Sequence, residues 1–221
     1  MKTPFLLTSF LTLSGFVSAQ MNPSFGIKAG VVSSTIKGDA TKSLEGLLNF
    51  TNGMITSSNR TSYYGGIYAT IPISNAVSLE PSLNYAQKGY QLNGALNVKG
   101  AEFLGINATA DLDFQYIEMP VVLNANLSGL HFFAGPQISY LIKSNLKTST
   151  GALGFNVINS QLEATQQFNR WETSLTGGVG VQLNKKMNII ASYDHGLTKI
   201  DANKNLDAYN RAYKIGLSMK L

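Results

Sequence analysis

The chain has 221 residues, of which only 13% are charged and 44% are hydrophobic, and its formal charge is +5. The low charge excludes a helical coiled coil and argues against an ordinary cytosolic enzyme. The 10 tyrosines and 11 phenylalanines argue against disorder. The absence of cysteine excludes disulfides, thiolate nucleophiles and cysteine-based metal sites. Because the positive charges are scattered, the sequence predicts no nucleic-acid partner.

Residues 1–19 have the features of a secretory signal peptide. Lys2 provides a positive start, Phe5 to Val17 form a short apolar stretch, and Val17-Ser18-Ala19 offers small residues for cleavage before Gln20. The apolar stretch is too short to span a bilayer comfortably as a helix. We therefore predict a mature domain of residues 20–221, with 16 basic and 12 acidic residues.

Period-2 alternation of apolar with small or polar residues runs through most of the mature chain and predicts strands. Eight segments alternate in this way, at residues 25–32, 63–71, 77–86, 116–125, 132–142, 171–183, 188–195 and 213–221. Their connections are alternately long and short. The long connections cover residues 33–60, 89–111, 144–169 and 198–207, and the short turns cover 72–75, 126–129 and 184–186.

This layout predicts an all-β fold, an eight-stranded antiparallel up-and-down transmembrane β-barrel with long extracellular loops and short periplasmic turns. The alternative is a soluble β-sandwich, which rarely sorts its connections by length and exposes more charge. The apolar faces of the segments carry almost no charge, which suits lipid. The opposite faces are rich in Gly, Ser, Thr, Asn and Gln, which suits a narrow interior filled by side chains.

Several charged residues fall on the inward faces of these segments. Buried charges must pair, so we predict a structural salt-bridge network inside the barrel formed by Lys28, Glu80, Glu118 and Lys214. Glu172 and Asp194 also face inward, nearer the outer end. A binding site or a proton path made of the same residues is the alternative, and the sequence does not separate the two. Six outward aromatic residues near strand ends predict an interfacial girdle: Tyr63, Tyr85, Tyr140, Trp171, Tyr193 and Tyr213.

The two histidines are the remaining candidates for chemistry. His131 begins a strand near the periplasmic rim and is expected to be interfacial. His195 follows Asp194 near the outer end, where a histidine could activate water or a serine. Neighbouring residues on a strand point to opposite faces, so Asp194 is badly placed to orient the His195 ring. The sequence contains no phosphate loop, zinc spacing or nucleotide fingerprint, so we expect no catalytic, cofactor-binding or metal-binding residues and no cofactor.

Several motifs resemble, in order, a family of Bacteroidetes outer-membrane β-barrels often labelled PorT-like. They are Leu79 to Gly89 (LEPSLNYAQKG), Tyr116 to Leu123 (YIEMPVVL, similar to the family's Y-x-E-x-P strand), Phe133 to Pro136, Gly177 to Val181, and Tyr193 to Thr198 (YDHGLT). Ser192 departs from the pattern, because that family often has arginine there. The resemblance covers residues 24–221. It implies an outer-membrane β-barrel domain and its location but no particular role.

From these observations we expect a small, non-enzymatic protein in the outer membrane of a Gram-negative bacterium, with a structural or loop-mediated binding role at the surface. The expected partners are outer-membrane lipids and lipopolysaccharide, the barrel-assembly machinery during insertion, and an unidentified surface or periplasmic partner. An outer-membrane lipid or peptide hydrolase using His195 and a narrow small-solute channel remain as alternatives.

Overall fold

The computed structural model describes residues 22–38, 55–96, 106–152, 155–202 and 207–221. The expected signal peptide, residues 1–19, lies outside these residues. Among the described residues, no helix is long and apolar enough to cross a membrane.

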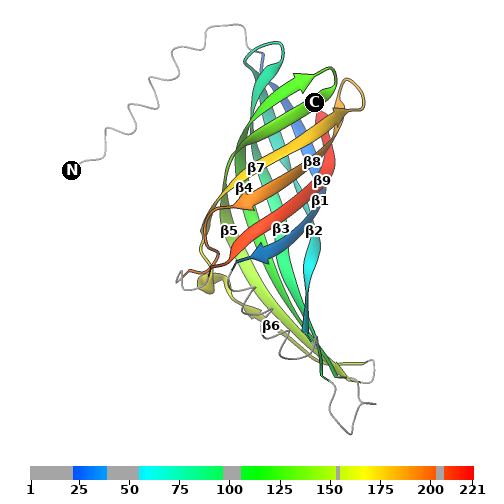
Figure 1. The fold of residues 1–221 in the computed structure, drawn as a ribbon, viewed down its shortest axis with the longest axis vertical. Helices are drawn as coiled ribbons and strands as arrows, with labels where there is room; N and C mark the ends of the chain where they lie inside the picture. Colours follow the sequence, from blue (N-terminus) through cyan, green and yellow to red (C-terminus); the bar gives the residue numbers. More distant parts are fainter. Residues whose placement is uncertain (1–21, 39–54, 97–105, 153–154, 203–206) are drawn as a thin grey trace, which may run out of the picture.

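Nine strands and one 3-10 helix, η3 (Thr165–Gln167), make up the regular structure of the described residues. The strands are β1 (Ser24–Lys37), β2 (Ile55–Pro72), β3 (Val77–Leu96), β4 (Ile106–Leu127), β5 (Leu130–Ala152), β6 (Phe155–Glu163), β7 (Trp171–Gln182), β8 (Met187–Gly196) and β9 (Tyr209–Lys220). The sheet order is β4-β3-β2-β1-β9-β8-β7-β5-β6, and an additional β4–β5 pairing closes it (Figure 1). Since β6 pairs only with β5, the closed ring has eight antiparallel strands, which confirms the predicted barrel.

The two ends of the barrel differ in their connections. At one end, called the turn end here, three short turns join β2 to β3, β4 to β5 and β7 to β8, and β9 ends beside the start of β1 (Figure 1). The β4–β5 turn has only two residues between the paired Leu127 and Leu130. Ser128 and Gly129 both have positive φ, 54° and 91°, as a tight hairpin of this kind requires. The opposite end is called the loop end.

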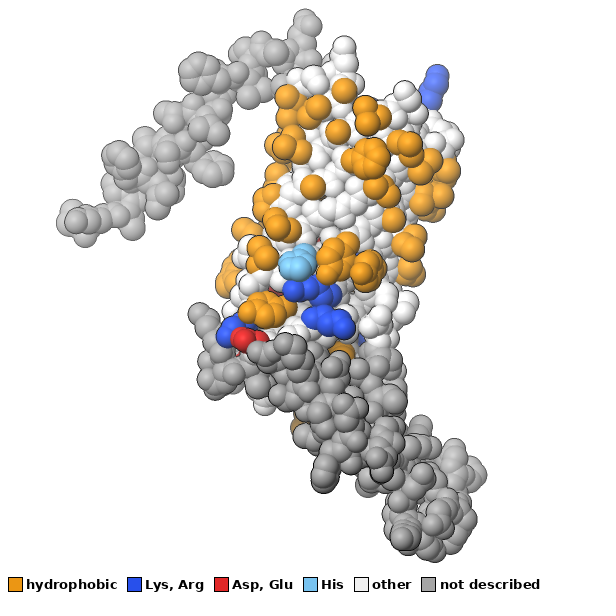
Figure 2. Space-filling view, viewed as in Figure 1, with side chains coloured by type: hydrophobic (Ala, Val, Ile, Leu, Met, Phe, Trp, Pro, Cys, Tyr) orange, Lys and Arg blue, Asp and Glu red, His pale blue; other side chains and the backbone are white. Residues whose placement is uncertain are grey.

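Alternation along the strands separates an apolar outer wall from a polar interior. On β1, Val31 is 52% exposed while Val32 is fully buried, and on β9 Ile215 is 59% exposed while Lys214 is 5% exposed. Large apolar side chains form a belt around the outside of the wall (Figure 2). A soluble monomer rarely exposes such a continuous apolar surface, whereas a barrel in lipid requires it.

The expected long connections contain more strand than the sequence predicted. β3 and β4 continue as a hairpin as far as the pair Leu96 and Ile106. The 144–169 stretch, expected to be a loop, holds the end of β5, the additional strand β6 and η3. The sequence of this stretch lacks the alternation of apolar and polar residues that marks a lipid-facing strand. The backbone ladder nevertheless continues, and the paired strands β3 to β6 project beyond the ring at the loop end (Figure 1).

Candidate functional site: the barrel interior

A cluster of four charged side chains lies in the middle of the interior. Nζ of Lys88 is 2.7 Å from Oε1 of Glu118, and Nζ of Lys214 is 2.5 Å from Oε2 of the same carboxylate. Lys214 is also 2.7 Å from Oδ2 of Asp194, and Lys88 is 3.7 Å from it. None of the four side chains is more than 6% exposed. Two ammonium groups and two carboxylates therefore balance each other in this ion cluster.

The strands bring these charges together because all four residues occupy inward positions on β3, β4, β8 and β9. The interior of an eight-stranded ring is just wide enough for such side chains to meet across it. The rings of Tyr116 and Tyr64 lie 5.3 and 5.5 Å from the ammonium groups of Lys88 and Lys214, respectively, within cation–π range. Gln137 reinforces the cluster by donating from Nε2 to Ser174 (3.1 Å) and to Asp194 (3.5 Å).

Glu172 lies beside the ion cluster but is held differently. Its side chain is buried, and Oε2 accepts a 2.5 Å hydrogen bond from Nδ2 of Asn210. The same amide nitrogen lies 3.2 Å from the hydroxyl of Tyr116. Among the described residues, no cation lies within ion-pair distance of this carboxylate. Glu172 is thus held by the uncharged amide of Asn210 rather than by a lysine.

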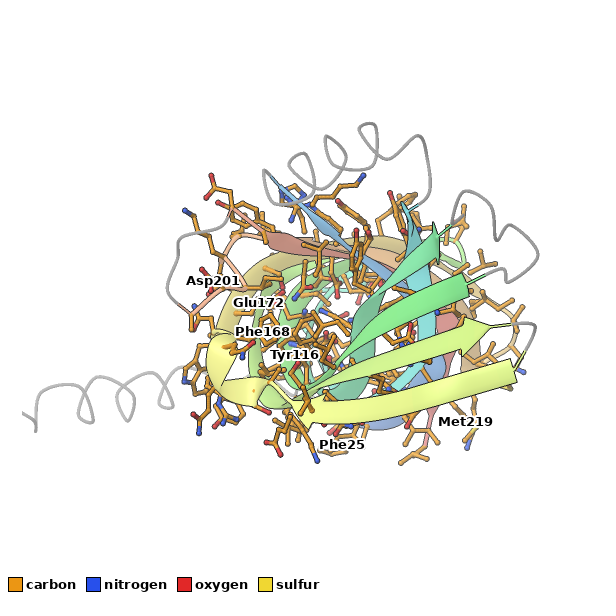
Figure 3. All side chains as sticks on the ribbon, turned by 90° about the horizontal axis from the view of Figure 1, so that it is seen from below. Phe25, Tyr116, Phe168, Glu172, Asp201 and Met219 are labelled. Atoms are coloured by element: carbon orange, nitrogen blue, oxygen red, sulfur yellow. The ribbon has the colours of Figure 1, made fainter. Side chains whose placement is uncertain are left out.

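An apolar cap closes the interior on the loop side of the ion cluster. Its buried members are Ile36, Tyr90, Phe114, Tyr116, Leu141, Ile200 and Ala208, with Phe168 packed against them. Phe168 meets Phe114 edge to face, with ring centroids 4.8 Å apart. Figure 3, seen from the loop end, places Phe168, Tyr116 and Glu172 across the middle of the ring.

Two connections supply the cap residues that do not come from the barrel wall. Phe168 lies between β6 and β7, and Ile200 lies between β8 and β9. The amide of Asn169 donates to the carbonyl of Ile200 at 2.8 Å, and Ile200 in turn donates to Ala208 at 2.9 Å. Outside the wall, Lys199 donates to Asp207, and this hydrogen bond raises the pKa of the Lys199 ammonium. These bonds fold both connections over the mouth of the barrel.

At the turn end the interior is hollow. A cavity of about 280 Å³ reaches from the mouth, lined by Ser24, Asn126, Lys185 and Lys186, to a floor formed by Tyr64, Asn84, Gln137 and Lys214. We call this cavity the vestibule. The floor residue Asn84 is paired in register with Glu118, and Lys214 is itself a member of the ion cluster. The vestibule therefore ends where the ion cluster begins.

The four residues of the expected network occupy two separate places. Glu118 and Lys214 belong to the ion cluster. Lys28 and Glu80 line the vestibule, where Nζ of Lys28 lies 3.6 Å from Oε1 of Glu80 and donates to Ser82 at 2.9 Å. Within the described residues, no ion pair connects the two groups. The network that the sequence predicted as one unit is, in the structure, two groups with different surroundings.

Sequence reasoning missed Lys88, which is among the most deeply buried side chains of the described residues. The predicted segment ends at Ala86, because the apolar pattern on the outer face fades there. Extending the inward series Ser82, Asn84 and Ala86 by two residues would have placed Lys88 inside the barrel.

Both histidines lie apart from any catalytic arrangement. His131, expected at the interface, points into the vestibule and is 7% exposed, because its neighbour Phe132 takes the outward position. The missing side chain of Gly180 makes this possible, since a Cβ there would lie 2.0 Å from Nε2 of His131. His195 is on the outer wall, while the Asp194 carboxylate is inside. The described residues contain no cluster of ligands suited to a metal ion.

The six outward aromatic residues named from the sequence lie as three adjacent pairs. Ring centroids are 6.1 Å apart for Tyr63 and Tyr85, 4.9 Å for Tyr140 and Trp171, and 4.8 Å for Tyr193 and Tyr213. Each pair joins neighbouring strands on the lipid side. This arrangement is typical of the aromatic belts that sit at the headgroup level of a bilayer.

A closed ring of eight strands, an apolar outer wall and a polar interior define an outer-membrane β-barrel. Residues 18–202 match the family model described as "Outer membrane protein beta-barrel domain", and the chain belongs to this family. Membership indicates a location in the outer membrane of a Gram-negative bacterium. No curated protein matches the chain.

Solved structures with a similar fold include three outer-membrane proteins. Ail, the attachment invasion locus protein of Yersinia pestis, is 14% identical with a TM-score of 0.45, over 90% of this chain and 98% of that one. OprG from Pseudomonas aeruginosa is 14% identical with a TM-score of 0.44, over 90% and 95% of the two chains. Neisserial surface protein A is 10% identical with a TM-score of 0.43, over 90% and 97%.

Proposed function

We propose that this chain is a small, non-enzymatic outer-membrane protein that uses its barrel as a rigid base and its loop end to contact partners at the cell surface. The observation that carries this proposal is the double seal of the interior. The ion cluster and the apolar cap follow one another along the interior, and we infer that together they block a polar path through the barrel. A barrel sealed in this way is unsuited to steady passage of solutes.

The loop end is the elaborated side of the molecule. β5 has 23 residues and extends well beyond its pairing with β7, and its last part pairs with β6 along the same edge. Outer-membrane barrels place long connections outside the cell and short turns in the periplasm. With that orientation, the projecting strands β3 to β6 stand above the membrane, where binding loops on rigid scaffolds commonly act.

Basic side chains on the outer wall support contact with outer-leaflet lipids, including the phosphates of lipopolysaccharide. Lys37 is paired in register with Tyr209, and His195 with Arg211, so these residues share one patch across β1, β8 and β9. Figure 2 shows histidine and basic side chains gathered at the lower edge of the apolar belt. Arg and Lys at the headgroup level are suited to bind phosphate.

The family motifs support two finer assignments. We propose that the chain belongs to the Bacteroidetes PorT-like branch, and that it is secreted with cleavage before Gln20. The exposed, alternating end of β9, with Leu221 68% exposed, suits recognition by the barrel-assembly machinery. Intact-mass measurement on outer-membrane fractions tests the cleavage, and retention of residues 1–19 would contradict it.

The surface role is tested in a deletion strain complemented either with the wild type or with a variant whose 145–163 hairpin is replaced by a short turn. The shortened barrel should still assemble, because its ring pairing of β5 with β7 ends at Tyr140 and Trp171. We expect it to behave like the deletion strain in assays of surface binding and envelope stress. Full complementation by the shortened barrel would refute a role for this part of the loop end.

The alternatives have separate tests. His195→Ala should leave the lipid A mass profile and peptide cleavage unchanged, because Asp194 lies on the other side of the wall. In planar bilayers the wild type should give no steady conductance. A steady open pore would contradict the sealed interior and favour the narrow channel.

A further inference from the structure

The vestibule is lined by more lysine than acidic side chains. Among the described residues, Glu80 is the only acidic side chain on the turn side of the ion cluster, whereas Lys28, Lys185, Lys186 and Lys220 all line the cavity. The charge of the fifth lining lysine, Lys214, is balanced by Glu118 and Asp194. Walls of low dielectric constant concentrate the field of such charges in a cleft. The cavity is therefore positively charged towards its mouth.

Lys28 is the charged group best placed to hold a ligand inside the cavity. Its side chain is 11% exposed, and its ammonium lies 5.7 Å from the ring of Tyr68 and donates to the neutral hydroxyl of Ser82. Glu80 is 3.6 Å away, which is longer than the 2.7–2.9 Å of a charge-assisted hydrogen bond. An ammonium group has three donors, so Lys28 can turn a donor towards an anion without leaving Ser82.

Two side-chain amide oxygens in the same cavity have no hydrogen-bond donor among the described residues. Oδ1 of Asn84 and Oδ1 of Asn124 are both buried and accept no hydrogen bond within the described structure, and both residues line the vestibule. Asn84 is only 3% exposed. A buried acceptor without a donor is unfavourable, so these groups are suited to a ligand that brings its own O–H or N–H donors.

We propose that the vestibule is a binding site for a small anion that also carries hydrogen-bond donors, such as a hydroxylated carboxylate or a phosphate ester, entering from the turn end. The rim lysines attract the anion, Lys28 binds its charged group, and the two asparagine side chains accept hydrogen bonds from its hydroxyl or amino groups. The volume of about 280 Å³ limits the ligand to the size of an amino acid or a small sugar acid. Because the ion cluster closes the floor, the ligand leaves by the way it entered.

The electrostatic part is tested with thiol chemistry, which is specific here because the chain has no cysteine. Ser192→Cys places a thiol in the vestibule, and Gln166→Cys places one on the exposed surface of the loop end. Refolded full-length mature protein is treated with a negatively charged or a positively charged methanethiosulfonate of similar size. We expect the ratio of negative to positive reagent rates to be about tenfold or more higher for Ser192→Cys than for Gln166→Cys. Equal ratios would overturn the proposal.

Binding is tested by protection of the Ser192→Cys thiol. Glycerol 3-phosphate and glycerate represent the phosphate and carboxylate classes, glycerol is the neutral control, and sodium chloride matches the ionic strength. Protection by one or both anions, with none by glycerol or salt, is the expected result and identifies the class. Protection by salt alone or by glycerol to the same extent would overturn an anion site.

A paired substitution links the protection to Lys28. Lys28→Met together with Glu80→Gln removes the ammonium without leaving the carboxylate unpaired, and it keeps the net charge. In this double variant the anions should no longer protect the Ser192→Cys thiol, while the unfolding midpoint should change little. Lys143→Met together with Glu163→Gln, which removes an exposed ion pair of 3.9 Å at the loop end and also keeps the net charge, is the matched control and should retain full protection. Unchanged protection in the double variant would overturn the role of Lys28. The outcome is independent of the loop-end function proposed above, which could fail without affecting it.

Discussion

The loop end and the turn end of the barrel interior are built by the same eight strands but have opposite properties. At the loop end, Phe168 and Ile200 pack with Phe114 and Leu141, and buried apolar side chains form the cap. At the turn end, many of the inward side chains are short serine, threonine and asparagine residues, and the vestibule lies between them.

The difference comes from the connections rather than from the strands. In a turn such as Leu127 to Leu130, only two residues lie between the paired ends and both are needed to reverse the chain. Such a turn is too short to place a side chain over the interior. The connection from β6 to β7 and the connection from β8 to β9 are long enough to return over the mouth. They bind each other through the hydrogen bond from Asn169 to Ile200. Loop length therefore determines which end of a small barrel is sealed, once the strands have fixed its width.

The largest expected difference between the two ends is their accessibility in intact cells. Single cysteines introduced by Gln166→Cys at the loop end and by Lys185→Cys at the turn end should differ in an all-or-none way towards a membrane-impermeant maleimide. Only the loop-end thiol should be labelled before lysis, and both should be labelled afterwards. Labelling of the turn-end thiol alone would invert the orientation.

The next largest effect concerns the ion cluster that separates the two ends. Glu118→Gln leaves Lys88 and Lys214 to share the single carboxylate of Asp194, and breaking a buried ion pair destabilises a protein by about 3–5 kcal/mol. We expect a loss of that size in the free energy of unfolding, measured by urea titration in detergent. Combining Lys88→Met with Glu118→Gln should recover much of the loss by restoring the charge balance.

Glu172→Gln is the matched control for this prediction. Glu172 is also buried, but its partner is the amide of Asn210, and among the described residues no ammonium lies within ion-pair distance of it. The control should therefore be much less destabilised than Glu118→Gln. Equal losses for the two variants would mean that burial of the carboxylate, rather than its pairing with lysine, governs stability.

A smaller effect is expected from opening the apolar cap. Full burial of a phenylalanine contributes about 1.5–3 kcal/mol, and Phe168 is only partly buried against the cap. Phe168→Ala should thus lower the free energy of unfolding by about 1–2 kcal/mol, whereas Leu162→Ala, at a side chain 62% exposed, should have little effect. Conductance in planar bilayers should stay absent in both variants, because the ion cluster remains. A steady conductance for Phe168→Ala alone would assign the seal to the cap.

The sequence predicted the ring and its two faces because a bilayer imposes a strict period of two on every strand that crosses it. Val31 and Val32 are the same amino acid, yet their positions in the alternation place Val31 towards lipid and Val32 inside. The same rule placed Glu118, Asp194 and Lys214 in the interior. Alternation determines the face on which each residue lies, so the two faces of the barrel can be predicted directly from the sequence.

The parts that could not be predicted lie where lipid no longer constrains the pattern. The sequences of β6 and of the ends of β3 to β5 lack a regular alternation of apolar and polar residues, so they give no periodic signal. The grouping of charges also depends on depth along the barrel, which requires the register between strands and the reach of each side chain. Lys28 and Lys214 lie on paired strands with the same inward direction, yet they bind different carboxylates.

The smallest expected effect, Glu80→Gln, tests whether this difference in depth matters. Glu80 is 18% exposed in the vestibule, and Lys28 would keep its hydrogen bond to Ser82 after the substitution. Ion pairs that water can reach contribute about 0–1 kcal/mol, so the unfolding midpoint in urea should move far less than for Glu118→Gln. If the two variants were equally destabilised, water would be excluded from Glu80 as fully as from the ion cluster. The contrast between the open and the sealed end would then not hold. A small shift for Glu80→Gln beside a large one for Glu118→Gln would establish that two carboxylates on the same inner face differ because only one is cut off from water.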